Sequence, residues 1–236
     1  MIDSREKSHG LSFRAERLDV MNETECLAAA KLIAEAMCFD SAWAYIFGKG
    51  NTEALEWLIY RNLWVHKGET IVYRSTARKS KEAKNEIIGT CTISPPAKKM
   101  ASTWEKIKLG LFKLPFLFGF DSLHRLMEVD SFFQKHSVYA RNQQTANLPM
   151  YNLHMMAVRK ELRGKGYGSK IIKDCLEHQC GDGLPGRNFS VALNTQTDRN
   201  VVFYQRLGFT ILQSNIFCGG PAEGGFRSTI MEYKPS

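Results

Sequence analysis

The feature that most constrains how this chain folds is a glycine-rich turn between an apolar segment and an amphipathic one. Residues 153–158 are apolar apart from His154, which is typical of a short, mostly buried strand. From Ile171 onward, apolar side chains recur at the spacing of one helical face. Between them, glycine occupies every second position, at Gly164, Gly166 and Gly168. This arrangement can bind a pyrophosphate, because the glycine turn allows close approach of the backbone and the helix N-terminus offers unpaired N–H groups.

The spacing of this turn differs from two better-known phosphate-binding loops. The dinucleotide fingerprint G-x-G-x-x-G fails because Ser169 takes its third glycine position, and no G-K-[ST] of a Walker loop occurs. The turn instead reads R-x-x-G-x-G from Arg163, and Asn200-x-x-x-Tyr204-x-x-x-Gly208-Phe209 follows downstream. Together these motifs resemble the acetyl-CoA motif of the GNAT superfamily of N-acetyltransferases. The resemblance is specific over residues 153–209 and architectural elsewhere.

The resemblance implies that acetyl-CoA is the co-substrate. In superfamily members the fourth strand splays from the fifth and leaves backbone groups free for the pantetheine arm. The turn and the following helix would hold the diphosphate, and a backbone N–H at Met156 or Ala157 would polarise the thioester carbonyl. The residues expected to bind acetyl-CoA are Met156, Ala157, Val158, Arg163, Gly164, Lys165, Gly166, Tyr167, Gly168, Ser169, Asn200 and Phe203.

Two side chains are candidates for proton transfer. The resemblance implies that Tyr204 protonates the departing thiolate, which suits a hydroxyl with an ordinary pKa near 10. His154 is the candidate base, acting directly or through a water, because imidazole titrates near neutral pH. Around them the sequence resembles the arylalkylamine-type acetyltransferases, which share the strand pattern x-L-H-x-x-A-V and the motif F-Y-Q-R-x-G-F of residues 203–209. Those members usually carry a second histidine where this chain has Asn152.

Alternation along the strand divides its side chains between two faces. Asn152, His154 and Met156 are expected on one face, opposite Leu153, Met155 and Ala157. One of these faces should look into the acceptor cleft, which makes Asn152 a candidate for substrate binding.

Two aromatic segments are further candidates for the acceptor pocket. Residues 39–47 read as irregular, and the resemblance implies that this segment, with Phe39 and Trp43, lines the pocket. Residues 102–136 combine aromatic residues with Glu128, and aromatic walls plus a carboxylate suit an amine with a hydrophobic group. Packing of both segments in a core is the alternative that the sequence leaves open.

The pattern of strands and helices predicts one α/β domain over residues 1–236. The order β-α-α-β-β-insert-β-α-β-α-β-β is similar to the mixed, mostly antiparallel central sheet of acetyl-CoA N-acyltransferases, with an acetyl-CoA-binding core at about 150–210. The helical insert is expected at 102–136, interrupted at Pro115 and around Gly119, and a polar connection at 141–149 leads to the fourth strand. The other strands are expected at residues 11–18, 70–76, 86–94, 189–193, 209–217 and 226–233.

Composition restricts the class of protein further. The 236 residues contain no long apolar run and no apolar leader, so a cytoplasmic protein without membrane contact is expected. The six cysteines form no C-x-x-C pair, so neither a disulfide framework nor a metal site is expected. The net charge of +8 is scattered and accompanies no nucleic-acid-binding motif, so no nucleic-acid partner is expected.

These observations predict an acetyl-CoA-dependent N-acetyltransferase acting on a primary amine of a small molecule, as a monomer or homodimer. Transfer should be direct, within a ternary complex, because no cysteine adjoins the motif as an acyl carrier. Two alternatives stay open: a protein lysine or N-terminal acetyltransferase, and a non-catalytic acyl-CoA-binding module.

Overall fold

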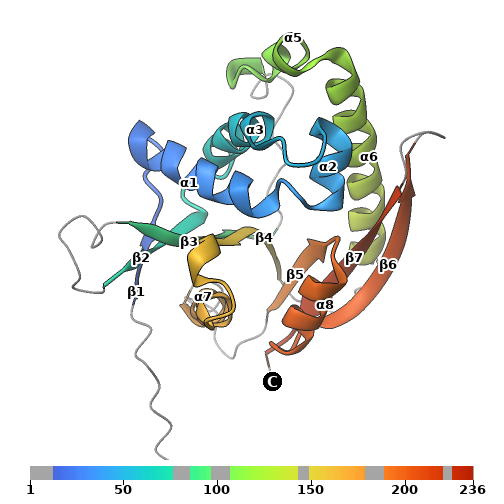
Figure 1. The fold of residues 1–236 in the computed structure, drawn as a ribbon. Helices are drawn as coiled ribbons and strands as arrows, with labels where there is room; N and C mark the ends of the chain where they lie inside the picture. The colour runs from blue at the N-terminus through green and yellow to red at the C-terminus, as the bar shows by residue number, and fades with distance from the viewer. Residues whose placement is uncertain are drawn as a thin grey trace, which may run out of the picture.

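The computed structural model describes residues 13–76, 86–96, 107–142, 149–178, 189–219 and 225–235 (Figure 1). Its strands are β1 (Phe13–Arg17), β2 (Thr70–Ser75), β3 (Ile87–Ser94), β4 (Met150–Val158), β5 (Ser190–Thr195), β6 (Thr210–Cys218) and β7 (Gly225–Tyr233). Its α-helices are α1 (Glu23–Met37), α2 (Ser41–Phe47), α3 (Thr52–Val65), α5 (Leu114–Phe118), α6 (Phe120–Asn142), α7 (Tyr167–His178) and α8 (Asp198–Gln205). Short 3-10 turns occur at Leu111–Lys113 and Lys160–Leu162.

The strands form one 7-stranded sheet in the order β1-β2-β3-β4-β5-β7-β6. Each neighbouring pair is antiparallel except β4 and β5, which are parallel. This confirms the predicted mixed, mostly antiparallel sheet with a helical insert before its fourth strand. The β4–β5 register covers only Met150–Leu153 against Ser190–Leu193. The two strands therefore separate after Leu153, and a seam opens in the middle of the sheet.

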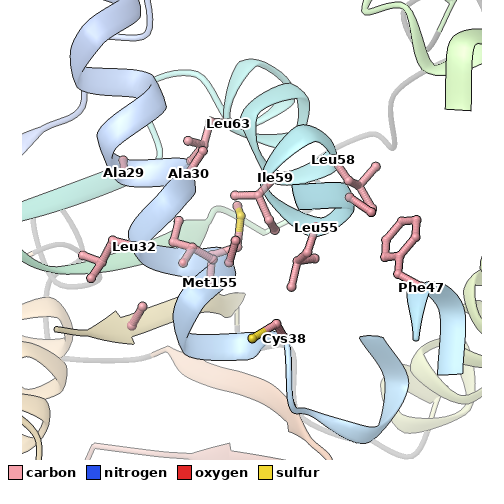
Figure 2. Packing of buried hydrophobic residues seen from close by; sticks show 14 of the residues in the cluster. Ala29, Ala30, Leu32, Cys38, Phe47, Leu55, Leu58, Ile59, Leu63 and Met155 are labelled. Atoms are coloured by element: carbon pink, nitrogen blue, oxygen red, sulfur yellow. The ribbon is translucent and has the colours of Figure 1, made fainter. Parts of the chain in front are cut away.

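Helices cover both faces of the sheet. In Figure 1, α1 and α3 lie on one side of β3 and β4, and α7 lies on the other. Buried side chains of α1 and α3 pack with Met155 in one core, as Figure 2 shows. Buried side chains of α7 pack with Leu153 and Phe209 in a second core. The sheet thus separates two hydrophobic cores, and β4 contributes to both.

Strand β4 contains a bulge that overturns the predicted alternation. Thr90 pairs with Ala157 and Thr92 with His154, so Met155 and Met156 together oppose Cys91. Met155 has a φ of 49°, the left-handed conformation that such an extra residue can require. As a result Met155 and Ala157 belong to the core beside α1, whereas Leu153 and Met156 pack in the core beside α7. Met156 therefore lies on the opposite face from the one predicted with His154.

Three expectations about the helical segments also need correction. Residues 41–47 form helix α2 rather than an irregular segment, because Ala42, Ile46 and Phe47 bury one side against the core. Pro115 does not interrupt a helix but lies in the first turn of α5, where a missing N–H costs no helical hydrogen bond. Helix α6 continues to Asn142, so the insert extends past residue 136 into the predicted polar connection.

Polar side chains cap the starts of two helices. Asn22 caps α1 by accepting from the Glu25 N–H at 3.2 Å, and Thr197 caps α8. Gly208 follows α8 with a φ of +91°. None of the described helices is both long and apolar enough to cross a membrane. The start of the predicted insert, at 102–106, and most of the predicted polar connection, at 143–148, lie outside the described residues.

Candidate active site

A cleft of about 1420 Å³ follows the seam where β4 leaves β5. It runs from the glycine turn before α7, past α8, to the end of α1 and the start of α2. Most of the predicted site residues line it: Phe39, Trp43, Asn152, His154, Met156, Ala157, Val158, Arg163, Gly164, Gly166, Gly168, Ser169, Asn200, Phe203 and Tyr204. Residues that are far apart in the sequence therefore meet in one space.

Three predicted residues do not line this cleft. Lys165 and Tyr167 belong to the glycine turn and the first turn of α7, but neither lines the space between the strands. The predicted acidic substrate residue, Glu128, accepts a hydrogen bond from the Tyr45 hydroxyl at 2.8 Å. That contact joins α2 to α6, so the structure gives Glu128 a role in packing the insert.

The glycine turn has the geometry that the sequence predicted for an anion site. Gly164 and Gly166 have φ values of 75° and 82°, a region that favours glycine. A Cβ at Gly168 would lie 3.3 Å from the Phe203 ring. Helix α7 begins at Tyr167, so its first N–H groups belong to the same turn. The positively charged end of a helix and an approachable backbone meet here at the cleft.

Tyr204 lies on α8 in the wall of the cleft. Its side chain is only 8% exposed, and its ring packs between those of Phe203 and Phe209 at centroid distances of 5.1 Å and 5.4 Å. Burial raises the pKa of Tyr204, and the nearby Cys91 and Asp40 add to the effect. The hydroxyl therefore keeps its proton at neutral pH, as a proton donor must.

Sequence reasoning missed Asp40, which is the acidic residue beside Tyr204 in this cleft. It precedes α2, but its side chain makes no capping hydrogen bond to that helix. Burial raises the pKa of Asp40 to about 6, while Arg163 acts in the opposite direction. An aspartate before a helix ordinarily indicates an N-cap, so the sequence carried no signal for a site role.

His154 lies on β4 at the far side of the cleft and belongs to a hydrogen-bonded cluster. Its Nε2 is 2.9 Å from the Ser94 Oγ, which donates to the Glu69 Oε2 at 2.6 Å. Glu69 also contacts the His66 Nδ1 at 2.9 Å. The two histidine rings meet edge to face with centroids 4.3 Å apart. Sequence reasoning missed His66 and Glu69, because they follow α3 and meet His154 only through the fold.

The same cluster contains side chains of the types that can bind a metal ion. The nitrogen and oxygen donors of His66, Glu69 and His154 lie within 4.8 Å of one another. The Ser94 Oγ stands among them at 2.6–3.2 Å from each, in the place that a cation would need. We therefore interpret these residues as a hydrogen-bond network.

Comparison with known families finds a match over the elements that form the cleft. Residues 132–211 match the model of the acetyltransferase (GNAT) domain. Over these residues the chain is similar to the GNAT acetyltransferases. The matched region contains β4, the glycine turn, α7, β5 and α8, which are the elements that form the cleft. A comparison with curated protein sequences found no match.

Several solved structures are similar to this chain in fold. Arylalkylamine N-acetyltransferase 2 from Aedes aegypti has a TM-score of 0.60 at 13% identity, covering 94% of this chain and 99% of the other. A polyamine N-acetyltransferase from Drosophila melanogaster has a TM-score of 0.54 at 14% identity, covering 95% and 100%. The NatC complex bound to Gag peptide and CoA has a TM-score of 0.52 at 13% identity, covering 95% and 99%. At these identities the similarity concerns the fold.

Proposed function

We propose that this protein transfers the acetyl group of acetyl-CoA directly to the primary amine of a small molecule that bears an apolar or aromatic group. The observation that carries the proposal is the single cleft that joins an anion-binding turn to a proton donor, a base and a carboxylate. Those groups supply what acetyl transfer to an amine requires, and each comes from a different element of the fold.

The donor end of the cleft suits coenzyme A. Arg163, Arg199 and Arg206 line this part of the molecule, where they complement the negative phosphates. The backbone of β4 after Leu153 pairs with β3 but not with β5, which leaves its other side for the pantetheine arm. The backbone N–H of Met156 or Ala157 is the proposed donor to the thioester oxygen.

The proposed reaction proceeds in a ternary complex. His154 takes a proton from the bound ammonium, directly or through a water, and the neutral nitrogen then attacks the thioester carbonyl. A C–N bond forms, the C–S bond breaks, and Tyr204 gives its proton to the departing thiolate. The remaining extra proton on the new amide nitrogen returns to Tyr204 through water. No cysteine lines the described part of the cleft, which supports direct transfer over an acyl-cysteine intermediate.

The acceptor end favours a cationic amine with an apolar group. Phe39, Trp43 and Phe133 line this end, and Asp40 provides a negative charge among them. With a pKa of about 6, Asp40 is roughly nine-tenths ionised at pH 7 and can pair with an ammonium group. An aromatic wall beside a carboxylate is a favourable site for such a molecule.

The test is release of CoA from acetyl-CoA in the presence of a panel of arylalkylamines, polyamines, aminoglycosides, amino acids and peptides with free lysines or N-termini. We expect the highest kcat/KM with arylalkylamines, and a decrease of about tenfold or more for them in Asp40→Asn. Turnover with peptides alone would instead establish a protein acetyltransferase. CoA binding without turnover of any acceptor would establish a non-catalytic module.

A further inference from the structure

His154 lies against a hydrogen-bonded cluster of Ser94, Glu69 and His66. The arylalkylamine-type pattern predicts a second histidine at position 152, where this chain has asparagine. The fold brings His66, at the end of α3, to within 4.3 Å of the His154 ring centroid instead. A second histidine thus stands beside the proposed base, but it comes from another element.

We propose that Glu69 acts through Ser94 as a positioning pair that fixes the tautomer and stabilises the charged form of His154, with His66 holding Glu69 in place. This inference rests on the proposed function, because it assumes that His154 acts as the base that takes a proton from the amine. Of these residues, Ser94 and His66 contact His154, and Glu69 reaches it through Ser94.

The hydrogen-bond directions follow from the distances. A carboxylate accepts and does not donate, so the single hydrogen of the Ser94 hydroxyl points to the Glu69 Oε2 at 2.6 Å. The Ser94 Oγ must then accept from the His154 Nε2 at 2.9 Å. In neutral His154 the hydrogen therefore sits on Nε2 and the lone pair on Nδ1. Nδ1 is the atom that takes the proton from the amine.

The charges of the cluster favour His154 as a base. When Nδ1 takes a proton, the imidazolium lies one hydroxyl away from the Glu69 carboxylate, which stabilises the new charge in a half-buried site. The His66 Nδ1 donates to the same carboxylate oxygen at 2.9 Å and fixes its orientation. The other charged or titratable groups that line the cleft are Asp40, Tyr151, Arg163, Asp198, Arg199, Tyr204 and Arg206.

Two neighbouring hydroxyls provide a matched control. Thr70 and Thr92 form a buried hydrogen bond of 2.9 Å between β2 and β3, and Thr92 pairs with His154 across the sheet. Thr70→Val removes a buried hydroxyl close to the cluster without removing any of its members. If the cluster served stability alone, this variant and Ser94→Ala would behave alike.

The experiment measures the pH midpoint of the His154 imidazole by NMR with labelled histidine, its signal assigned by its loss in His154→Gln. We expect the midpoint to fall by about one pH unit in Glu69→Gln and in Ser94→Ala, because each variant removes stabilisation of the imidazolium. Thr70→Val should leave it unchanged. In turnover, the same two variants should lower kcat about tenfold and move the acidic limb of the pH profile to lower pH, with KM for acetyl-CoA unchanged.

The two readouts separate this inference from the function on which it rests. An unchanged midpoint in both Glu69→Gln and Ser94→Ala would overturn the positioning role even if the wild type acetylates amines. If the midpoint shifts in both variants although the wild-type protein acetylates no acceptor, the positioning pair is supported and the proposed function is overturned. A shift of equal size in Thr70→Val would also contradict the inference.

Discussion

At the scale of single residues, the site depends on side chains whose protonation is set by burial. Tyr204 is almost fully enclosed and keeps its proton, whereas Asp40 is half-buried and ionises only above its raised pKa of about 6. Both groups line one cleft, and Asp40 contributes to the raised pKa of Tyr204. Each therefore supports a prediction of its own.

For Tyr204, removal of the hydroxyl alone should affect the chemical step. We expect Tyr204→Phe to lower kcat about 10²-fold, because the thiolate loses its general acid, with little change in KM for acetyl-CoA. Steady-state kinetics on the best amine of the panel measures both constants. Tyr233→Phe is the matched control, because the Tyr233 ring packs on Phe209 and does not line the cleft. An unchanged kcat in Tyr204→Phe would show that Tyr204 is not the general acid.

For Asp40, the raised pKa predicts that ionisation of the carboxyl lowers the free energy of unfolding. The carboxyl ionises at about pH 3.8 in the unfolded chain and about 6 in the folded one, so wild-type stability decreases as pH rises between these values. Asp40→Asn should thus be more stable than wild type by about 1–2 kcal/mol at pH 7, allowing for partial exposure, and equally stable near pH 4. Chemical denaturation at both pH values measures this, with Glu35→Gln on exposed surface as control. Equal stability at pH 7 would contradict the prediction.

At the scale of elements, the glycine turn and the strand before it form one wall of the cleft. Their local sequence was sufficient to predict them, because glycine spacing and an apolar run are short-range signals. The same sequence could not predict the bulge at Met155, which depends on how β3 pairs with β4. Helix α2 was missed for a related reason. A helix of 7 residues is marginal by itself, and burial of its apolar side against the core stabilises it.

A prediction for the turn compares two glycines with similar φ values. Gly166 and Gly48 have φ values of 82° and 88°, so alanine should destabilise the fold by about 1–2 kcal/mol at either position. Only Gly166 lines the cleft, so only Gly166→Ala should raise KM for acetyl-CoA, by about tenfold. Thermal denaturation of the two variants measures the loss of stability from backbone strain, and steady-state kinetics measures the change in KM for acetyl-CoA. An equal KM in both variants would mean that the turn does not contact the cofactor.

At the scale of the whole molecule, the insert is held to the sheet by aromatic packing. Phe132 of α6 contacts Phe217 of β6 and Phe226 of β7 at centroid distances of 5.3 Å and 6.1 Å. The sequence predicted a helical insert rich in aromatic residues, but not which strands it covers. The sequence also could not predict that His66 and Asp40 join this cleft, since they come next to Tyr204 and His154 only through the fold.

The aromatic contacts predict how firmly the insert is attached. We expect Phe132→Ala to lower the free energy of unfolding by about 2–4 kcal/mol, because it leaves a cavity against two strands. Phe120→Ala, at a side chain that is 67% exposed, should change it by less than about 0.5 kcal/mol. Urea denaturation of both variants measures the difference. Similar values would show that the insert packs differently.

The short β4–β5 register has a thermodynamic consequence for the protein as a whole. Few backbone pairs connect the two halves of the sheet. A molecule bound in the seam would contact both halves. Its binding would therefore stabilise the folded state against unfolding. At a concentration of CoA about 100 times its dissociation constant, linkage adds about 2.7 kcal/mol and should raise Tm by about 5–10 °C. Without cofactor, amide hydrogen exchange should be fastest along the edges of β4 and β5 that face the opening.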